Sequence, residues 1–208
     1  MGGKRVNRAF RASHSPCYET GNAKGPTMQP TKTRADLWMD LALVAFLIGF
    51  DVTARVLPHA QGVWPVAASA IFAGRMLRYP ALALAVPLAA VALSNFALPA
   101  DDWRVSLVVY AAVLLPAILG MLARRWRGAL PIVGGTIANS LAFFAATNFA
   151  VWAFNGMYPM TLDGLAQCYT AALPFLDRTV FGDLFWMAVL FGGAWLVQHG
   201  PALMRRSP

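Results

Sequence analysis

The chain has 208 residues, of which 58% are hydrophobic and only 12% are charged, and its mean hydropathy is +0.54. Soluble domains carry about 25% charged residues, so this composition excludes a soluble globular protein and predicts a chain that crosses a membrane several times. The formal net charge is +8. Its distribution argues against a nucleic-acid-binding face, because the basic residues collect in the first 34 residues and at the ends of apolar runs.

The N-terminal stretch is unlike a signal peptide. Residues 1–35 lack an apolar core and are rich in Ser, Thr, Gly, Pro, Lys and Arg, so we expect a disordered basic tail in the cytoplasm. Residues 36–200 form the predicted membrane domain, and residues 201–208 a short cytoplasmic tail. Cys17 lies in the first tail and Cys168 in a predicted outer loop, so the membrane separates them and no disulfide joins them in this prediction.

Apolar runs predict an all-α membrane protein with a bundle of six transmembrane helices. About 20 residues span a hydrocarbon core, so the second run is marginal and is expected to be broken or re-entrant. Pro116 and Gly120 predict a kink in the fourth. The six runs cover residues 37–57, 61–77, 80–98, 106–123, 129–154 and 181–198.

The loop charges predict the orientation. With the N-terminal tail inside, every inner loop is basic and only three arginines, Arg55, Arg104 and Arg178, lie outside. This agreement with the positive-inside rule predicts that both termini are cytoplasmic. The arginines assigned to the inner ends are Arg75, Arg78, Arg124, Arg125, Arg127, Arg205 and Arg206.

The first segment carries three charges on one helical stripe. Asp40, Asp51 and Arg55 follow the spacing of a single helix face, and Asp51 and Arg55 can form a direct i, i+4 ion pair. Charges at membrane depth normally face the bundle interior or a cavity. Two interpretations stay open, a structural ion pair and the polar wall of an outward pocket, while Asp40 is expected to be solvated near the inner interface. His59 follows in the outer loop and is a candidate ligand or pH-sensitive group.

The fifth segment and the loop after it hold the densest polar and aromatic residues outside the tail. Asn139 and Asn148 lie on nearly opposite faces, so we expect one to bond to a neighbouring helix and the other, preferably Asn148, to face a cavity. In the predicted outer loop 155–179, apolar spacing indicates a short amphipathic helix that begins near Thr161, a candidate N-cap, and stops at Pro174. Asp183 would then stand at the start of the sixth helix.

These residues define a candidate solute site at the outer end of the bundle, with the loop closing over it. No sequence motif predicts an enzyme, a cofactor or a metal site: HExxH, a phosphate loop and a nucleophile elbow are missing, and the histidines are scattered. The candidate substrate-binding residues are Asp51, Arg55, His59, Asn148, Trp152, Tyr158, Thr161, Gln167, Tyr169 and Asp183.

Several motifs over residues 45–200 resemble an uncharacterised bacterial family of transport proteins. They are N-F-x-V-W from Asn148, Y-P-x-T-x-x-G-L from Tyr158, C-Y-x-x-A-x-P-F from Cys168, the final L-F-G, D-x-x-x-R-x-x-P-H from Asp51 and P-x-A-A-x-x-x-F-x-G from Pro65. The chain departs from the family at Ser94-Asn95, where relatives tend to carry Ser-Asp. The family is similar to the S-components of energy-coupling-factor transporters, six-helix proteins that capture a vitamin or metal in an outward pocket. The resemblance implies a multi-pass protein of the bacterial cytoplasmic (inner) membrane.

Two functions compete at this point. The first is a transport protein that binds a small solute from the outer side, with its energy supplied by a partner or an ion gradient. The second is a non-transporting accessory or structural subunit of a larger membrane complex, whose contacts would be the small-residue faces around Ala45 and Gly49 and within residues 67–74. Both place the chain in a lipid bilayer and neither involves nucleic acid.

Overall fold

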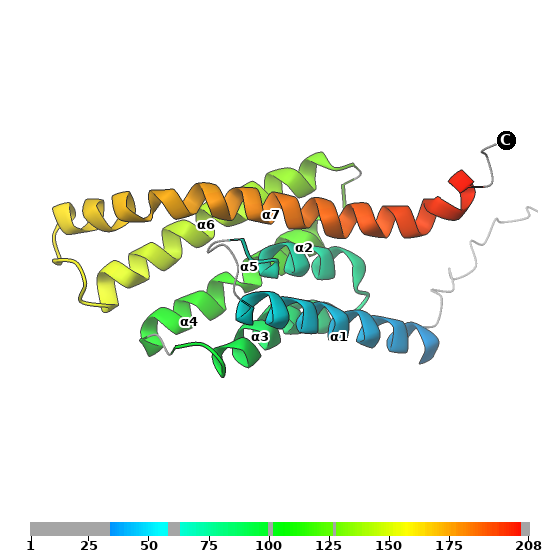
Figure 1. The fold of residues 1–208 in the computed structure, drawn as a ribbon, viewed down its shortest axis with the longest axis horizontal. Helices are drawn as coiled ribbons and strands as arrows, with labels where there is room; N and C mark the ends of the chain where they lie inside the picture. The colour runs from blue at the N-terminus through cyan, green and yellow to red at the C-terminus, as the bar shows by residue number, and fades with distance from the viewer. Residues whose placement is uncertain (1–33, 58–62, 100–101, 127, 205–208) are drawn as a thin grey trace, which may run out of the picture. The chain divides into compact units, whose positions relative to one another are not determined.

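The computed structural model describes residues 34–57, 63–99, 102–126 and 128–204, and every regular element in these ranges is an α-helix. Figure 1 shows them in chain order, and five of the predicted segments agree with them to within a few residues. The predicted tail 1–35 falls almost wholly outside the described ranges, as does His59. The helices are α1 Arg34–Val56, α2 Val66–Met76, α3 Pro80–Asn95, α4 Trp103–Ala112, α5 Leu114–Ala123, α6 Leu130–Phe154 and α7 Leu162–Met204.

Within the described ranges, four helical segments are long and apolar enough to cross a membrane: α1, α4 together with α5, α6, and α7. The helix α2, with 11 residues, is only about 17 Å long, well short of a hydrocarbon core of about 30 Å. This confirms the expectation that the second segment is too short for an ordinary span. Because α2 packs against α1, α3, α5, α6 and α7, other helices rather than lipid surround it.

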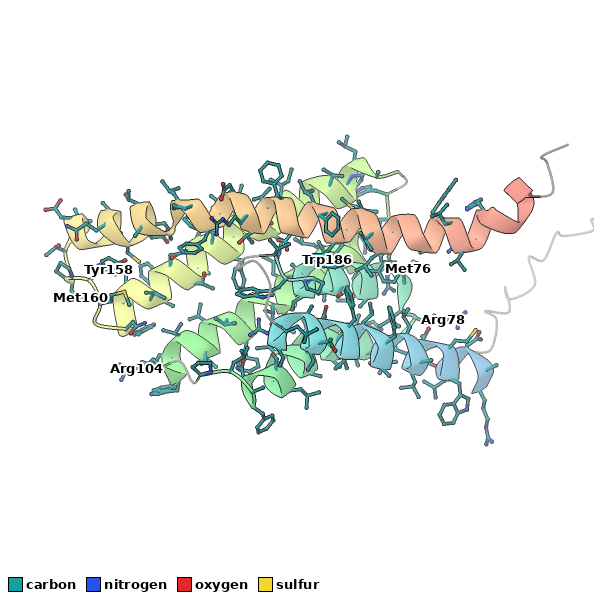
Figure 2. The ribbon with its side chains drawn as sticks, viewed as in Figure 1. Met76, Arg78, Arg104, Tyr158, Met160 and Trp186 are labelled. Carbon is teal, nitrogen blue, oxygen red and sulfur yellow. The ribbon has the colours of Figure 1, made fainter. Side chains whose placement is uncertain are left out.

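The buried face of α1 is the stripe that the sequence predicts. Its buried residues are Asp40, Val44, Leu47 and Asp51. Asp40, however, is not solvated as expected: it is 6% exposed, and its Oδ2 accepts a hydrogen bond from the backbone N–H of Arg78 at 3.1 Å. The Arg78 guanidinium also pairs with Asp36 at 2.8 Å. The first turns of α1 are thereby joined to the link between α2 and α3 (Figure 2).

A proline divides the fourth segment into two helices. The regular helix is interrupted between α4 and α5 at Val113, three residues before Pro116, although Val113 keeps near-helical backbone angles (φ −72°, ψ −11°) and its N–H still bonds to the Val109 carbonyl at 2.9 Å. Pro116 has no N–H to give to the carbonyl of Ala112, and its ring crowds that carbonyl. The break is where the predicted kink should lie, and it faces the bundle interior because Val113 and Pro116 are both buried.

The predicted architecture of the last 50 residues is wrong. Instead of an outer loop with its own short helix followed by a sixth span, a single helix α7 of 43 residues runs from Leu162 to Met204, and the connection after α6 is only residues 155–161. Pro174 removes one backbone hydrogen bond, but apolar helix-forming residues flank it on both sides, and such prolines are tolerated in membrane helices. At about 65 Å, α7 is far longer than a bilayer core. Its N-terminal half lies along α6 (Figure 1).

The closest helix crossing joins α2 to α5 through two glycines. A Cβ on Gly74 would overlap the backbone carbonyl of Ala117, and a Cβ on Gly120 would overlap the carbonyl of Ile71. The contact is reciprocal, since each glycine faces the residue three positions before the other. Small residues at such crossings let two backbones approach within van der Waals contact.

Two arginines complete this crossing at its C-terminal end. Arg124, just after α5, donates to the carbonyls of Gly74 and Leu77 at 2.6 Å each. Arg75, in the last turn of α2, donates to the carbonyl of Ala123 at the end of α5. The last carbonyls of a helix lack intrahelical partners, so each helix caps the other with a cation, which the helix dipole also favours.

Replacing Gly74 or Gly120 by alanine should destabilise the bundle, because the new methyl group meets backbone carbonyls that cannot rotate away. Overpacking of this kind costs about 1–3 kcal/mol. We expect a lower apparent melting temperature of the purified protein, followed by tryptophan fluorescence. The matched control is Gly49→Ala, where a Cβ meets nothing within 4 Å, and where alanine should leave stability unchanged or raise it. Equal melting temperatures for all three variants would contradict the close crossing.

Candidate binding cavity

A cavity of about 80 Å³ lies at the N-terminal end of α2, between α1, the α4–α5 break, α6 and α7. Its wall is largely apolar and carries four polar side chains, Arg55, Asn139, Thr179 and Asp183. A single water needs roughly 10–15 Å³ by the same kind of measure, so the space suits a small molecule rather than a large one. The apolar lining residues are Trp64, Val66, Ala67, Val109, Ala112, Val113, Pro116 and Phe143.

The position of this cavity follows from the shortness of α2. Pro65 stands at the N-cap of α2 and Val66 begins it, so the helix ends well inside the bundle and leaves space beyond its first turn. The indole N–H of Trp186 in α7 donates to the carbonyl of Val63 at 3.2 Å, which fixes the chain leading into α2 against α7 (Figure 2). Non-helical backbone at membrane depth is tolerated where it lines such a cavity.

Asn139 lines the cavity and carries an unpaired acceptor. Its side chain is 2% exposed, and its Oδ1 has no hydrogen-bond partner among the residues that the structure describes. Buried polar atoms are nearly always paired with protein, water or a ligand. Asn139 is therefore the candidate polar contact that α6 contributes to this cavity.

Asp183 supplies a buried carboxyl group. It is 4% exposed, and its Oδ2 accepts a hydrogen bond of 2.6 Å from the hydroxyl of Ser140 in α6. The prediction that Asp183 opens a helix is wrong, because α7 begins at Leu162 and Asp183 lies in its middle. Its place on the cavity comes from the packing of α7 on α6.

Arg55 reaches the cavity from the last turn of α1. Its Nε donates to the hydroxyl of Ser94 at 2.8 Å, a second nitrogen lies 3.4 Å from Asn95 Oδ1, and the guanidinium lies over the Trp64 ring at 5.5 Å. These contacts attach the end of α1 to the end of α3 and hold the guanidinium at the rim of the cavity.

The predicted Asp51–Arg55 ion pair is not formed. Asp51 is 0% exposed, its Oδ1 accepts from the hydroxyl of Ser69 in α2 at 2.7 Å, and its Oδ2 has no partner in the described part of the chain. The reason is geometric: Asp51 points between α1 and α2, whereas the longer Arg55 side chain extends to α3. Asp51 thus joins α1 to α2 and does not line the cavity.

A second cavity of about 240 Å³ adjoins the first and shares Trp64, Phe143 and Thr179 with it. Asn148, the residue favoured from the sequence, lines this second space, but its Nδ2 donates to the carbonyl of Phe144 on its own helix at 2.8 Å. Asn139, the residue not favoured, faces the first cavity. The sequence does not show which of the two asparagines faces the first cavity, because this depends on how α7 packs against α6.

The remaining predicted residues mainly fasten α6 to α7. The Trp152 indole donates to the Pro159 carbonyl at 3.0 Å, and the Tyr169 hydroxyl donates to the Ala145 carbonyl at 2.6 Å. Thr161 caps α7 as predicted, its Oγ1 accepting from the N–H of Gly164 at 3.1 Å. A Cβ on Gly164 would overlap the Pro159 carbonyl, so the Y-P-x-T-x-x-G-L motif encodes a tight turn.

Tyr158 and Gln167 lie apart from both cavities. Tyr158 is at the turn between α6 and α7 (Figure 2), and Gln167 lines an open depression on α7.

Sequence reasoning missed Trp64, Asn139 and Thr179 as cavity residues. Thr179 fell in the predicted outer loop, which in the structure is part of α7. Within the described ranges, no group of three His, Cys, Asp or Glu side chains could hold a metal ion.

The long apolar helices of the described ranges indicate an all-helical, multi-pass membrane protein, and the cavity lies between them. The chain belongs to the family of unknown function DUF6580, whose sequence profile matches residues 35–203. No curated protein and no solved structure matches it.

Asn95 offers a test of the contact at the end of α1. Replacing Asn95 by Asp puts a carboxylate beside the Arg55 guanidinium, and a partly exposed ion pair of this kind contributes up to about 1 kcal/mol. We expect a higher melting temperature at low salt, with part of the gain lost in 1 M NaCl. The exposed Asn155→Asp change, at the end of α6, is the charge-matched control. A gain of equal size in both variants would argue against the Arg55 contact.

The capping role of Thr161 is tested by comparing alanine and serine. Thr161→Ala removes the side-chain acceptor for Gly164 and should cost about 1 kcal/mol, lowering the melting temperature. Thr161→Ser keeps the acceptor and should melt close to the unaltered protein. If both variants melt alike, the turn does not depend on this cap.

Proposed function

We propose that this chain is a transport protein of the bacterial cytoplasmic membrane. It binds a small solute in the cavity at the N-terminal end of α2, and this cavity opens to the outer side of the membrane. The observation that carries the proposal is a cavity lined together by Arg55, Asp183 and Asn139, whose buried Oδ1 has no partner among the described residues. A purely structural interior would bury apolar groups there, since an unpaired buried acceptor costs about 1–3 kcal/mol.

In this proposal the chain crosses the membrane six times, with both termini in the cytoplasm. Arg75, Arg78 and Arg124 lie at the C-terminal ends of α2 and α5, and the positive-inside rule assigns this end to the cytoplasm. The cavity lies at the opposite end of α2 and so faces outward. Although α2 is too short to span the hydrocarbon core, we count it as a crossing, because the cavity at its N-terminal end occupies the remaining thickness of the membrane.

The family whose motifs this chain carries is similar to S-components at the level of the fold, and this analogy supports a solute-binding role of the same kind. Energy would come from a partner or an ion gradient, because the chain carries no nucleotide-binding motif. We expect the solute to be small, since the cavity at the N-terminal end of α2 measures only about 80 Å³. No catalytic role is assigned to any of these residues.

The test is solute binding by the purified full chain, screened by the rise in melting temperature against small metabolites that include amino acids, sugars, vitamins and nucleobases. At least one should bind, and Asn139→Leu, which removes the acceptor at similar volume, should weaken it by tenfold or more. A deletion strain should lose uptake of the same solute. Gln167→Ala, outside both cavities, is the control for binding.

Failure of every solute together with unchanged uptake would contradict the proposal. Recovery of the chain in a stable complex with other membrane subunits, with no solute bound, would favour the accessory-subunit alternative instead. In that case Asn139→Leu should affect neither complex formation nor growth.

A further inference from the structure

Polar groups of opposite charge line the cavity at the N-terminal end of α2. The first turn of α2 and the Arg55 guanidinium are positive, whereas Asn139 and the Asp183 carboxyl group offer acceptors. Arg55 is held by Ser94 and Trp64, Asp183 is held by Ser140 in α6, and no ion pair joins Arg55 to Asp183 among the described residues. A cavity lined by both a cation and an anion is suited to a ligand that carries both charges.

The first turn of α2 is an anion-binding element. The backbone N–H groups of Val66 and Ala67 have no acceptor among the described residues, as expected at a helix start, and both residues line the cavity. Free N–H groups and the positive end of the helix dipole favour a carboxylate. The Arg55 guanidinium, which also lines this cavity, adds a full positive charge.

Two other lining residues accept hydrogen bonds. Asn139 Oδ1 is buried and unpaired among the described residues, and Asp183 keeps one oxygen beyond the Ser140 contact. An ammonium group, with three donors and a positive charge, matches such a set of acceptors.

Apart from Thr179, whose hydroxyl donates to the carbonyl of Phe175, the rest of the wall is apolar. Val109, Val113 and Phe143 are among these apolar lining residues. An aliphatic group of a few carbons would be desolvated there, while a second charged or strongly polar group would find no partner. The wall therefore restricts the ligand to a short apolar side chain.

We propose that the cavity binds a small zwitterion, an α-amino acid with a short apolar side chain. Its carboxylate lies at the N-terminal end of α2 beside Arg55, its ammonium group lies between Asn139 Oδ1 and Asp183, and its side chain contacts Val109, Val113 and Phe143. This inference rests on the proposed function and names the substrate class of the same cavity.

The experiment compares molecules that differ by one charged group. L-alanine, L-valine and L-leucine are titrated into the purified full chain in detergent, with isobutylamine and isovalerate as the analogues of valine that lack the carboxylate and the ammonium group. At least one amino acid should bind, and valine should exceed each analogue by tenfold or more, because each lost contact is a charge-assisted one.

The variants locate the two ends of the ligand. Asp183→Asn keeps the shape of the side chain and should weaken amino-acid binding by tenfold or more, as should Asn139→Leu, while Gln167→Ala should leave it unchanged. The melting temperature of each variant without ligand reports whether it is folded. If both cavity variants melt like the unaltered protein and still bind normally, the proposal is overturned.

Two further outcomes separate this inference from the proposed function, and a third tests both together. Binding of isobutylamine or isovalerate as tightly as valine overturns the zwitterion and leaves the cavity as a solute site. Binding of a different metabolite that Asn139→Leu abolishes, with no amino acid bound, also overturns the inference alone. If no metabolite binds at all, the inference and the proposed function fail together.

Discussion

The crossing of α2 and α5 at Gly74 and Gly120 is the constraint on which the rest of the bundle depends. The two backbones touch at this point, and Arg75 and Arg124 each cap the other helix just beyond it. Because every other described helix except α4 also packs on α2, the depth at which α2 sits sets the positions of its neighbours. A side chain at either glycine would push the two helices apart.

The same crossing accounts for the cavity. Since α2 is held at its C-terminal end and has only 11 residues, its N-terminus stops inside the bundle. The α4–α5 break at Val113 faces the space beyond it, and α7 closes the side opposite. The Trp186–Val63 hydrogen bond keeps the preceding chain at the edge of this space. The short central helix α2, the interruption near Pro116 and the long helix α7 together produce a largely apolar cavity with four polar side chains on its wall.

Much of this fold could be predicted from local sequence patterns. Hydrophobic runs gave five of the segments, helical spacing gave the buried stripe of Asp40, Val44, Leu47 and Asp51, and Thr161 was recognised as a cap. These features depend on neighbours in the chain. The continuity of α7 through Pro174 did not emerge, because a proline that ends a soluble helix can be retained where packing supports both sides.

The cavity could be predicted only in part, for a related reason. Arg55 and Asp183 were chosen as candidates, but the pairing of Asp51 with Ser69 and the choice between Asn139 and Asn148 depend on which helix lies opposite. Spacing within one helix shows which residues share a face and says nothing of what that face meets. The turn motif around Pro159 was assigned to a ligand site, whereas its polar groups bond to one another.

The most direct measurement is the reactivity of a single cysteine at position 179, introduced as Thr179→Cys after Cys17 and Cys168 are changed to serine. Thr179 lines both cavities, and cysteine is close to threonine in size. A small, membrane-impermeant methanethiosulfonate should modify it from outside intact cells, and a solute that raises the melting temperature should slow the reaction. Modification only from the cytoplasmic side, or at a rate that such a solute leaves unchanged, would contradict an outward-facing binding cavity at the N-terminal end of α2.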